Sequence, residues 1–95
     1  MGVPRKSVSK SITAQNVFTD SIQVDKGDAG SISVSGTFVG TVTFQRRLDG
    51  VNWRDIETYI AETEKDFEAG EGSEIRLGVK TGDYTSGTIE ARLGV

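Results

Sequence analysis

A carboxylate and an aromatic ring stand close together near the middle of the chain, in the stretch LDGVNW over residues 48–53. Asp49 followed by Trp53, the only Trp of the sequence, is the simplest pattern of a sugar-binding or hydrolytic site. The same residues also fit a structural interpretation. Asp-Gly between two strand-like segments is a strong hairpin signal, because the turn needs a positive φ that Gly50 adopts without steric cost.

We favour the structural interpretation. Asp49 and Gly50 then make a hairpin turn, and Trp53 begins the returning strand, where its ring is expected to close the open end of a small sandwich. Replacing a buried ring of this size by Ala would cost about 3–5 kcal/mol. The alternative is a carbohydrate-binding or adhesion module, in which Trp53, Tyr59 and Tyr84 would stack on the ligand.

Pairs of acids were considered as catalytic groups. Asp55 and Glu57 share one face of a predicted strand, where their side chains would stand about 7 Å apart. A glycosidase needs two carboxyls, one of them with a pKa raised by burial, but acids on the exposed face of a sheet are expected on any soluble domain. We therefore predict that the protein is not an enzyme and has no catalytic residues.

The acidic run over residues 57–74 holds seven acids and one Lys. It lacks the turn-forming Gly at the centre of a calcium-binding loop. The chain also contains neither Cys nor His, which removes disulfides, imidazole chemistry and the usual nitrogen and sulfur ligands of zinc, copper and iron. No metal ligand and no cofactor are predicted. Since no stretch of 18 apolar residues occurs, no membrane partner is predicted either.

The charge is divided unevenly along the chain. Residues 1–16 carry Arg5, Lys6 and Lys10 and no acid, whereas residues 17–95 carry eight basic and 14 acidic side chains. We predict a basic extended N-terminal arm over residues 1–16 and a single β-sandwich domain over residues 17–95.

The three cations of the predicted arm, Arg5, Lys6 and Lys10, are its candidate partner-binding residues, because a basic arm can become ordered on another surface. The acidic body argues against nucleic acid as a partner. A frayed terminus that is merely solvated is the alternative. If the arm is separate, deletion of residues 2–14 should leave the folded core intact.

Period-two alternation predicts the fold class. In SISVSGTFVG and TVTFQRRL, at residues 31–48, apolar side chains alternate with hydroxyl-bearing ones as on a half-buried strand. Turn residues recur about every 8–12 positions, and no segment has a convincing helical period. We expect an all-β fold, a small antiparallel β-sandwich or barrel of about six to seven strands with the extended N-terminal arm. Strands are predicted over residues 17–24, 31–38, 41–48, 53–60, 74–80 and 88–95.

More detailed expectations follow from the same alternation. The strands over residues 31–38 and 41–48 should form an antiparallel hairpin with its turn at Val39-Gly40. The strand over residues 53–60 should place Ile56 and Ile60 on one aliphatic face, and residues 61–74 should be a loop from which Phe67 enters the core. The inward residues of the last two strands are predicted to be Ile75, Leu77 and Val79, and Ile89, Ala91 and Leu93.

Two long segments, SISVSGTFVGTVTFQRRLDGVNWRDIETY and IRLGVKTGDYTSGTIEARLGV, carry a family resemblance. They resemble small β-sandwich virion structural proteins of tailed bacteriophages, over about residues 30–95. Arg47 stands where that pattern has Ser, and Val51 where it often has Gly. The matching residues determine the fold and are not catalytic: Gly36, Gly40, Asp49, Gly50, Trp53, Tyr59, Arg76, Gly82, Tyr84 and Gly87.

The resemblance implies a structural role on a phage particle. It predicts a protein of the virion, synthesised in the host bacterial cytoplasm, that decorates or stabilises the capsid by docking in many copies on the shell. The partner would be the major capsid protein or another virion protein, and the chain would form a homo-oligomer, with a trimer as the first expectation. A component of the tail or of the head-to-tail region is the alternative within the same family.

Overall fold

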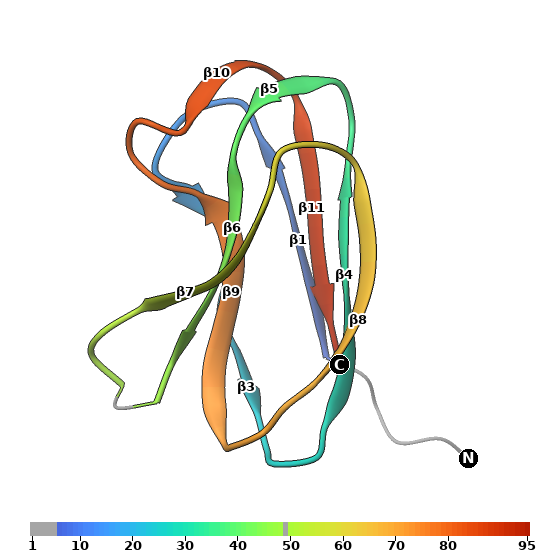
Figure 1. Cartoon of the computed structure of the whole chain (residues 1–95), viewed down its shortest axis with the longest axis vertical. Coiled ribbons are helices and arrows are strands. Elements are labelled where there is room, and N and C mark those ends of the chain that lie inside the picture. The colour runs from blue at the N-terminus through green and yellow to red at the C-terminus, as the bar shows by residue number, and fades with distance from the viewer. Residues whose placement is uncertain (1–5, 49) are drawn as a thin grey trace.

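The computed structural model describes residues 6–48 and 50–95, which form eleven β-strands in two facing sheets and a short ribbon (Figure 1). The all-β sandwich expected from the sequence is confirmed. Seven strands have six or seven residues, and the other four have two to four. Within the described ranges, no helix is long and apolar enough to cross a membrane.

The first sheet has four antiparallel strands in the order β1-β11-β4-β8. Their bounds are Ser7–Ile12 for β1, Ile89–Gly94 for β11, Ala29–Ser35 for β4 and Thr63–Glu68 for β8. Its two edges are therefore the first long strand, β1, and the acidic strand β8.

The second sheet has β9 (Ser73–Val79) and β6 (Val42–Arg47) at its centre and β7 (Arg54–Tyr59) at one edge. The other edge is divided between β2 (Val17–Phe18) and β3 (Ile22–Val24), which both pair with β9. A ribbon of β5 (Phe38–Gly40) and β10 (Tyr84–Gly87) lies across one end of the sandwich (Figure 1).

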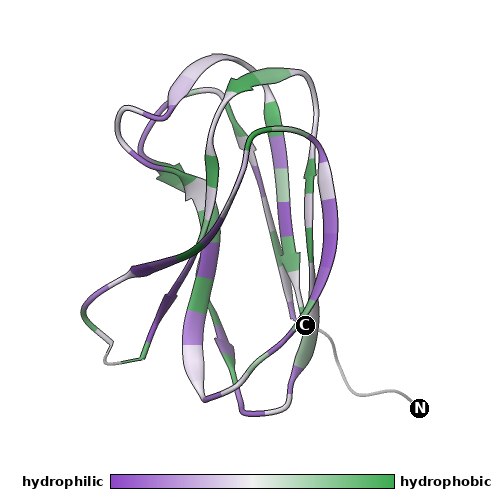
Figure 2. Ribbon diagram, viewed as in Figure 1, coloured by the Kyte–Doolittle hydropathy of each residue, from purple (hydrophilic) through white to green (hydrophobic). Residues whose placement is uncertain are grey.

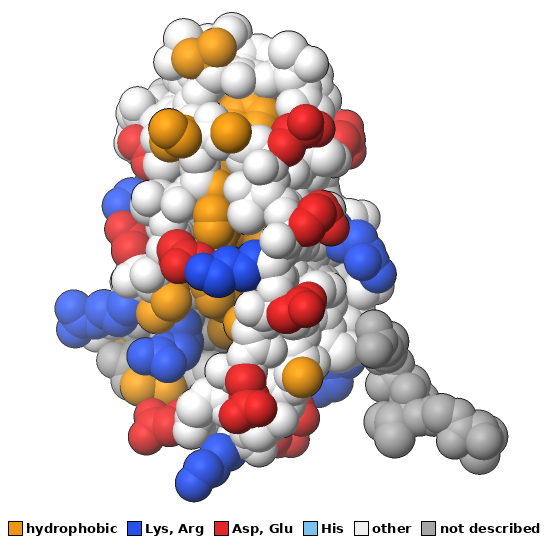
Figure 3. All heavy atoms as spheres, turned by 45° about the vertical axis from the view of Figure 1, so that its right-hand side comes forward, with side chains coloured by type: hydrophobic (Ala, Val, Ile, Leu, Met, Phe, Trp, Pro, Cys, Tyr) orange, Lys and Arg blue, Asp and Glu red, His pale blue; other side chains and the backbone are white. Residues whose placement is uncertain are grey.

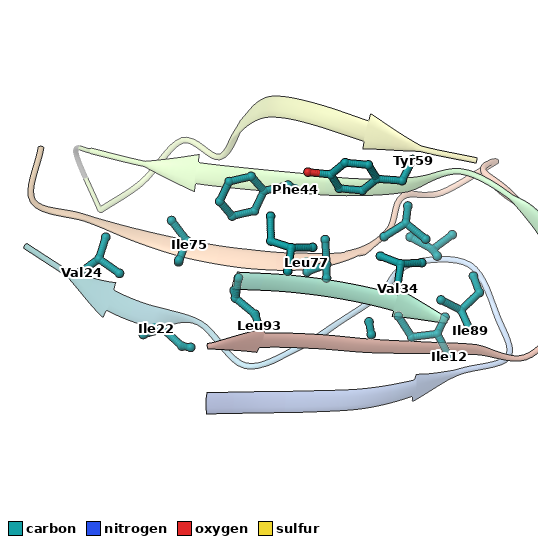
Figure 4. Close-up of a cluster of buried hydrophobic side chains, with 14 residues drawn as sticks. Ile12, Ile22, Val24, Val34, Phe44, Tyr59, Ile75, Leu77, Ile89 and Leu93 are labelled. Carbon is teal, nitrogen blue, oxygen red and sulfur yellow. The ribbon is translucent and has the colours of Figure 1, made fainter. Parts of the chain in front are cut away.

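The core lies between the two sheets (Figure 4). The alternation predicted for β9 and β11 is confirmed, since Ile75, Leu77, Val79, Ile89, Ala91 and Leu93 are all buried. The colouring by hydropathy shows the same alternation along these strands (Figure 2). Phe67 packs against the core as expected, with its ring centroid 5.4 Å from that of Phe44.

The boundary predicted between an arm and a domain at residue 16 is wrong for the described part of the arm. Residues 7–12 form β1, which pairs along its whole length with β11, and Ile12 is fully buried. The sequence did not predict this strand, because the segment is rich in Ser and buries only one side chain. An edge strand of this kind has little apolar alternation. Deletion of residues 2–14 would therefore remove part of the core, contrary to the expectation from the sequence.

The predicted hairpin between residues 31–38 and 41–48 is also wrong. β4 and β6 lie in opposite sheets, and the chain crosses between them through β5. Alternation shows which side chains face the core but not which sheet a strand joins, since the two inner faces have the same period.

Two further expectations are corrected along the edges. The acidic segment expected to be a loop contains β8, whose acids alternate on the exposed side of an edge strand. In β7, Phe44 pairs with Glu57 and Gln45 with Asp55, which makes Ile56 a bulge. Tyr59, which pairs with the buried Val42, faces the core, whereas Ile56 and Ile60 are 46% and 76% exposed, so the predicted aliphatic face of this strand is not the inward one.

Candidate functional site

The hairpin β6–β7 extends away from the sandwich at the end where the chain turns back (Figure 1). Gly50 has φ of 74°, which agrees with its predicted place in the turn. Asp49, the other predicted turn residue, lies outside the described residues. Leu48 and Val51 beside the turn are exposed. The projecting hairpin therefore carries aromatic, charged and apolar side chains close together in the sequence.

Trp53 is half-buried and is not part of the core, so its predicted role in closing the sandwich is wrong. The guanidinium carbon of Arg47 lies 4.6 Å from the centroid of its ring, and that of Arg76 lies 4.3 Å from it. Because Arg47 is on β6 and Arg76 on β9, the ring holds the hairpin against the neighbouring strand by cation–π contacts. The Trp anchors the hairpin, but from the outer face of the sheet.

The same stack extends to β2. The guanidinium of Arg76 also lies 3.9 Å from the ring centroid of Phe18. Phe18 reaches this position because Gly78 lies beneath it, where an added Cβ would come within 2.5 Å of both the Phe18 ring and its Cα. The stack therefore crosses three strands of the sheet.

A polar network completes the outer face. Nε and Nη2 of Arg47 donate to the two carboxylate oxygens of Glu74 at 3.1 and 3.0 Å. Nε of Arg76 donates to Oε1 of Gln45 at 2.8 Å, and Nε2 of Gln45 donates to Oδ1 of Asp55 at 2.9 Å. Burial, and secondarily the charge of Arg47, lowers the pKa of Arg76.

The two acids considered as a catalytic pair belong to different ion pairs. Lys80 donates to Asp55 at 2.7 Å, and the hydrogen bonds from Lys80 and Gln45 lower the pKa of this carboxyl. Lys65 of β8 and the Tyr59 hydroxyl both donate to Oε1 of Glu57, and these bonds lower its pKa. A general acid would need a raised pKa. The arrangement favours fixed charges over proton transfer.

The three aromatic residues proposed for sugar stacking lie in different environments. Tyr59 belongs to the core, and burial, followed by its hydrogen bond to Glu57, raises the pKa of its hydroxyl. Tyr84 lies in the ribbon and donates to the carbonyl oxygen of Gly87 at 2.7 Å. Trp53 is covered by two guanidiniums. Because Tyr59 is buried, these residues do not combine into one exposed stacking surface.

Of the three candidate partner-binding cations of the arm, Arg5 lies outside the described residues. Lys6 is joined to the sandwich, since its backbone exchanges hydrogen bonds with Val95 and its Nζ donates to the carbonyl of Gln23 at 3.0 Å. Lys10 is exposed on β1. The structure does not bring Lys6 or Lys10 to the hairpin, which carries its own basic residues.

The inner face of the hairpin differs from its outer face. Arg46 and Arg54 are paired in register on β6 and β7 and line a cavity of about 210 Å³ with Leu48 and Asn52. A second cavity, of about 130 Å³, lies beside Arg46 and is lined in part by Phe44, Ile56 and Phe67. Sequence reasoning missed this pair, although period-two alternation along residues 41–48 places Arg46 on the same face as Val42 and Phe44. The signal was a cation at a position where the alternation requires an inward side chain.

Within residues 6–48 and 50–95, the side chains form no group of three or more Asp or Glu placed to hold a metal ion.

Comparison with known proteins identifies no relative. No protein-family model matches the sequence, and no match was found among curated proteins or solved structures. The similarity to phage virion proteins thus stays a prediction from the residues quoted above.

Proposed function

We propose that the protein is a non-enzymatic structural component of a tailed-phage particle, which decorates or stabilises the capsid by docking in several copies on the shell. The family resemblance is the reason for assigning the protein to a phage particle. The exposed apolar side chains of the hairpin are the reason for assigning it a docking role.

One observation carries the docking proposal. Among the described residues, five large hydrophobic side chains are exposed, and four of them lie between residues 48 and 60. They are Leu48, Val51, Ile56 and Ile60, whereas Val39 lies in the ribbon. Leu48 and Val51 lie beside the turn and Ile56 lies in β7, whereas Ile60 follows the far end of β7, where Tyr59 pairs with Val42. Single exposed apolar residues are ordinary, but several of them on one hairpin are typical of a protein–protein contact.

The rigidity of the segment supports the same function. The outer face of the hairpin is fixed by Trp53 and its two arginines. A contact surface on a fixed element loses little conformational entropy on binding, which favours affinity. The small core of a 95-residue domain would gain stability from such contacts.

The direct test uses particles of the phage that encodes the chain, prepared from a strain in which its gene is deleted. Purified wild-type protein is expected to rebind at a saturable number of copies and to raise the tolerance of the particles to heat and low salt. Electron microscopy of the rebound particles distinguishes the capsid from the tail. Particles with unchanged tolerance and no bound protein would contradict the proposal.

Matched variants locate the contact. The double variant Leu48→Ser/Val51→Ser removes the two exposed apolar side chains beside the turn of the hairpin, and we expect at least a tenfold loss of affinity for the particle. Val39→Ser removes a 59% exposed side chain in the ribbon and should bind as wild type does. Equal losses from both changes would contradict docking through the hairpin.

A further inference from the structure

The inner face of the hairpin carries two cations that oppose one another. Arg46 and Arg54 are direct cross-strand partners, which places their side chains on the same side of the sheet. Within the described strands they are the only two cations in direct register. Like charges placed directly opposite each other destabilise a strand pair. The arrangement therefore costs stability unless an anion lies between them.

Neither arginine has an acidic partner within residues 6–48 and 50–95. The neighbouring cations differ in this respect, since Arg47 is paired with Glu74 and Lys80 with Asp55. Arg46 and Arg54 instead line the cavity of about 210 Å³ with Leu48. Two guanidiniums that line one cavity, with no hydrogen bond or ion pair to the rest of the described chain, supply N–H donors of the kind that bind a carboxylate.

An apolar cavity adjoins this charged one. Arg46 lines both, and the second cavity, of about 130 Å³, is formed in part by Phe44, Ile56 and Phe67. In the space-filling view, basic and hydrophobic side chains lie together at the projecting hairpin, while acidic side chains follow β8 (Figure 3). A ligand for this surface would therefore combine one negative charge with a neighbouring apolar group.

We infer that this face binds an extended segment of a partner protein, with an acidic side chain between Arg46 and Arg54 and an adjacent apolar side chain in the second cavity. Among the described strands, β7 pairs only with β6, so its other edge allows an extended backbone to lie beside it. A polyanion such as nucleic acid fits poorly, because Glu68 lines the apolar cavity and Glu57 lies on β7 itself. The identity of the partner, a virion protein, rests on the proposed function. The chemistry of the site does not depend on it.

The binding test uses two short peptides that differ in one group. Acetyl-Ile-Glu-Ile-amide carries the carboxylate, and acetyl-Ile-Gln-Ile-amide replaces it with an amide of the same shape. Titrations are followed by ¹⁵N NMR, including the Nε–H signals of the arginines. We expect the Glu peptide to shift the signals of Arg46 and Arg54 and to bind at least tenfold more tightly than the Gln peptide. Equal affinities, or no shift at millimolar peptide, would overturn the inference.

Variants provide the matched control. Arg46→Gln/Arg54→Gln should weaken binding of the Glu peptide at least tenfold, while Arg92→Gln, which removes an exposed arginine of the other sheet, should leave it unchanged. Dispersed NMR spectra would show that each variant is folded. If Arg92→Gln weakens binding as much as the double variant, the effect is one of net charge and the site is wrong.

Two further experiments test which kind of molecule binds the inner face of the hairpin. Inorganic phosphate should bind more weakly than the Glu peptide, and tighter phosphate binding would overturn a peptide site. Light scattering should show the same mass for the wild type and the double variant at all concentrations. Self-association of the wild type that the double variant loses would mean that a second copy occupies the face, which would overturn the assignment to a partner protein.

Particle binding separates this inference from the proposed function. If wild type and Arg46→Gln/Arg54→Gln rebind to particles equally well, the carboxylate site fails and the structural role stands. If the wild type binds the Glu peptide but no particle, the structural role fails and the site stands.

Discussion

The two faces of the hairpin β6–β7 are made from the same strands and carry similar residues, yet their side chains are used differently. On the outer face, Arg47 and Arg76 contact Trp53 and bond to Glu74 and Gln45. On the inner face, Arg46 and Arg54 oppose each other beside open cavities, with no acidic partner in the described chain. One face holds the hairpin in place, and the other remains open for a ligand.

The difference arises from alternation. Arg46 and Arg47 are adjacent in sequence, and because successive side chains of a strand point to opposite faces, one belongs to each surface. A sheet extended past the end of its partner sheet must expose its inner face, as the hairpin does here (Figure 1). A cation at such a position remains solvated, whereas the apolar Phe44 two residues earlier is buried.

The largest effect is expected from crowding the outer face. Gly78→Ala would place a Cβ 2.4 Å from the carbonyl oxygen of Val17 and 2.5 Å from Phe18, so β2 would have to move. We expect a loss of about 2–3 kcal/mol in the free energy of unfolding, measured by urea denaturation. Gly70→Ala is the matched control, because nothing lies within 4 Å of its added Cβ. Equal stability of the two variants would show that β2 does not hold the stack.

Removing the ring should have the next largest effect. Trp53→Ala loses a half-buried ring and two cation–π contacts, and we expect it to cost about 2 kcal/mol. This value is lower than the 3–5 kcal/mol expected for a core residue, since the ring lies on the outer face. Val51→Ala, which shortens a 72% exposed side chain beside the same turn, should change stability by less than about 0.5 kcal/mol. A loss near 5 kcal/mol for Trp53→Ala would argue for core packing instead.

Trp53 illustrates how much the sequence predicts. Asp49-Gly50 and the flanking alternation were sufficient to predict a hairpin, and the structure confirms one between β6 and β7. The position of the ring could not be predicted, because it depends on Arg76 and Phe18, which come from strands that are distant in the sequence. Alternation defines local faces, whereas cross-strand contacts depend on the order of strands in the sheet.

The edges of the sandwich were harder to predict than its centre. The central strands β9 and β11 bury alternate apolar residues, and their inward sets were predicted correctly. Edge strands bury fewer side chains, so β1 resembled a basic arm and β8 an acidic loop. In β8 the alternation was present as acids at positions 64, 66 and 68, a period-two pattern made of charges instead of apolar residues.

Adjacent arginines provide the sharpest test of the two faces. Arg47→Gln removes a cation–π contact with Trp53, which alone contributes about 0.5–1 kcal/mol, and it also leaves Glu74 without its ion pair. Arg46→Gln removes one of two opposed charges, so stability should be unchanged or rise by up to about 0.5 kcal/mol. Thermal and urea unfolding of both variants measure the difference. A similar loss in both would contradict the division into a paired and an open face.

The smallest effect concerns pH. Hydrogen bonds from Arg47 lower the pKa of Glu74 below its ordinary 4.5, and bonds from Lys80 and Gln45 lower that of Asp55 below 3.8. A carboxyl whose pKa is lower in the folded state contributes stability above its unfolded pKa and loses that contribution as the pH falls through the folded value. The free energy of unfolding should therefore decrease as the pH is lowered from 5 to about 3.

The two faces should respond differently in that pH range. Arg47→Gln should make the decrease shallower, because the pKa of Glu74 then returns toward its ordinary value in the folded state. Arg46→Gln removes the same charge from a side chain without an acidic partner in the described residues and should leave the slope of the wild type. Urea unfolding at several pH values compares the slopes. If both variants flatten the profile equally, the dependence comes from net charge, and the ion pair of the outer face does not govern it.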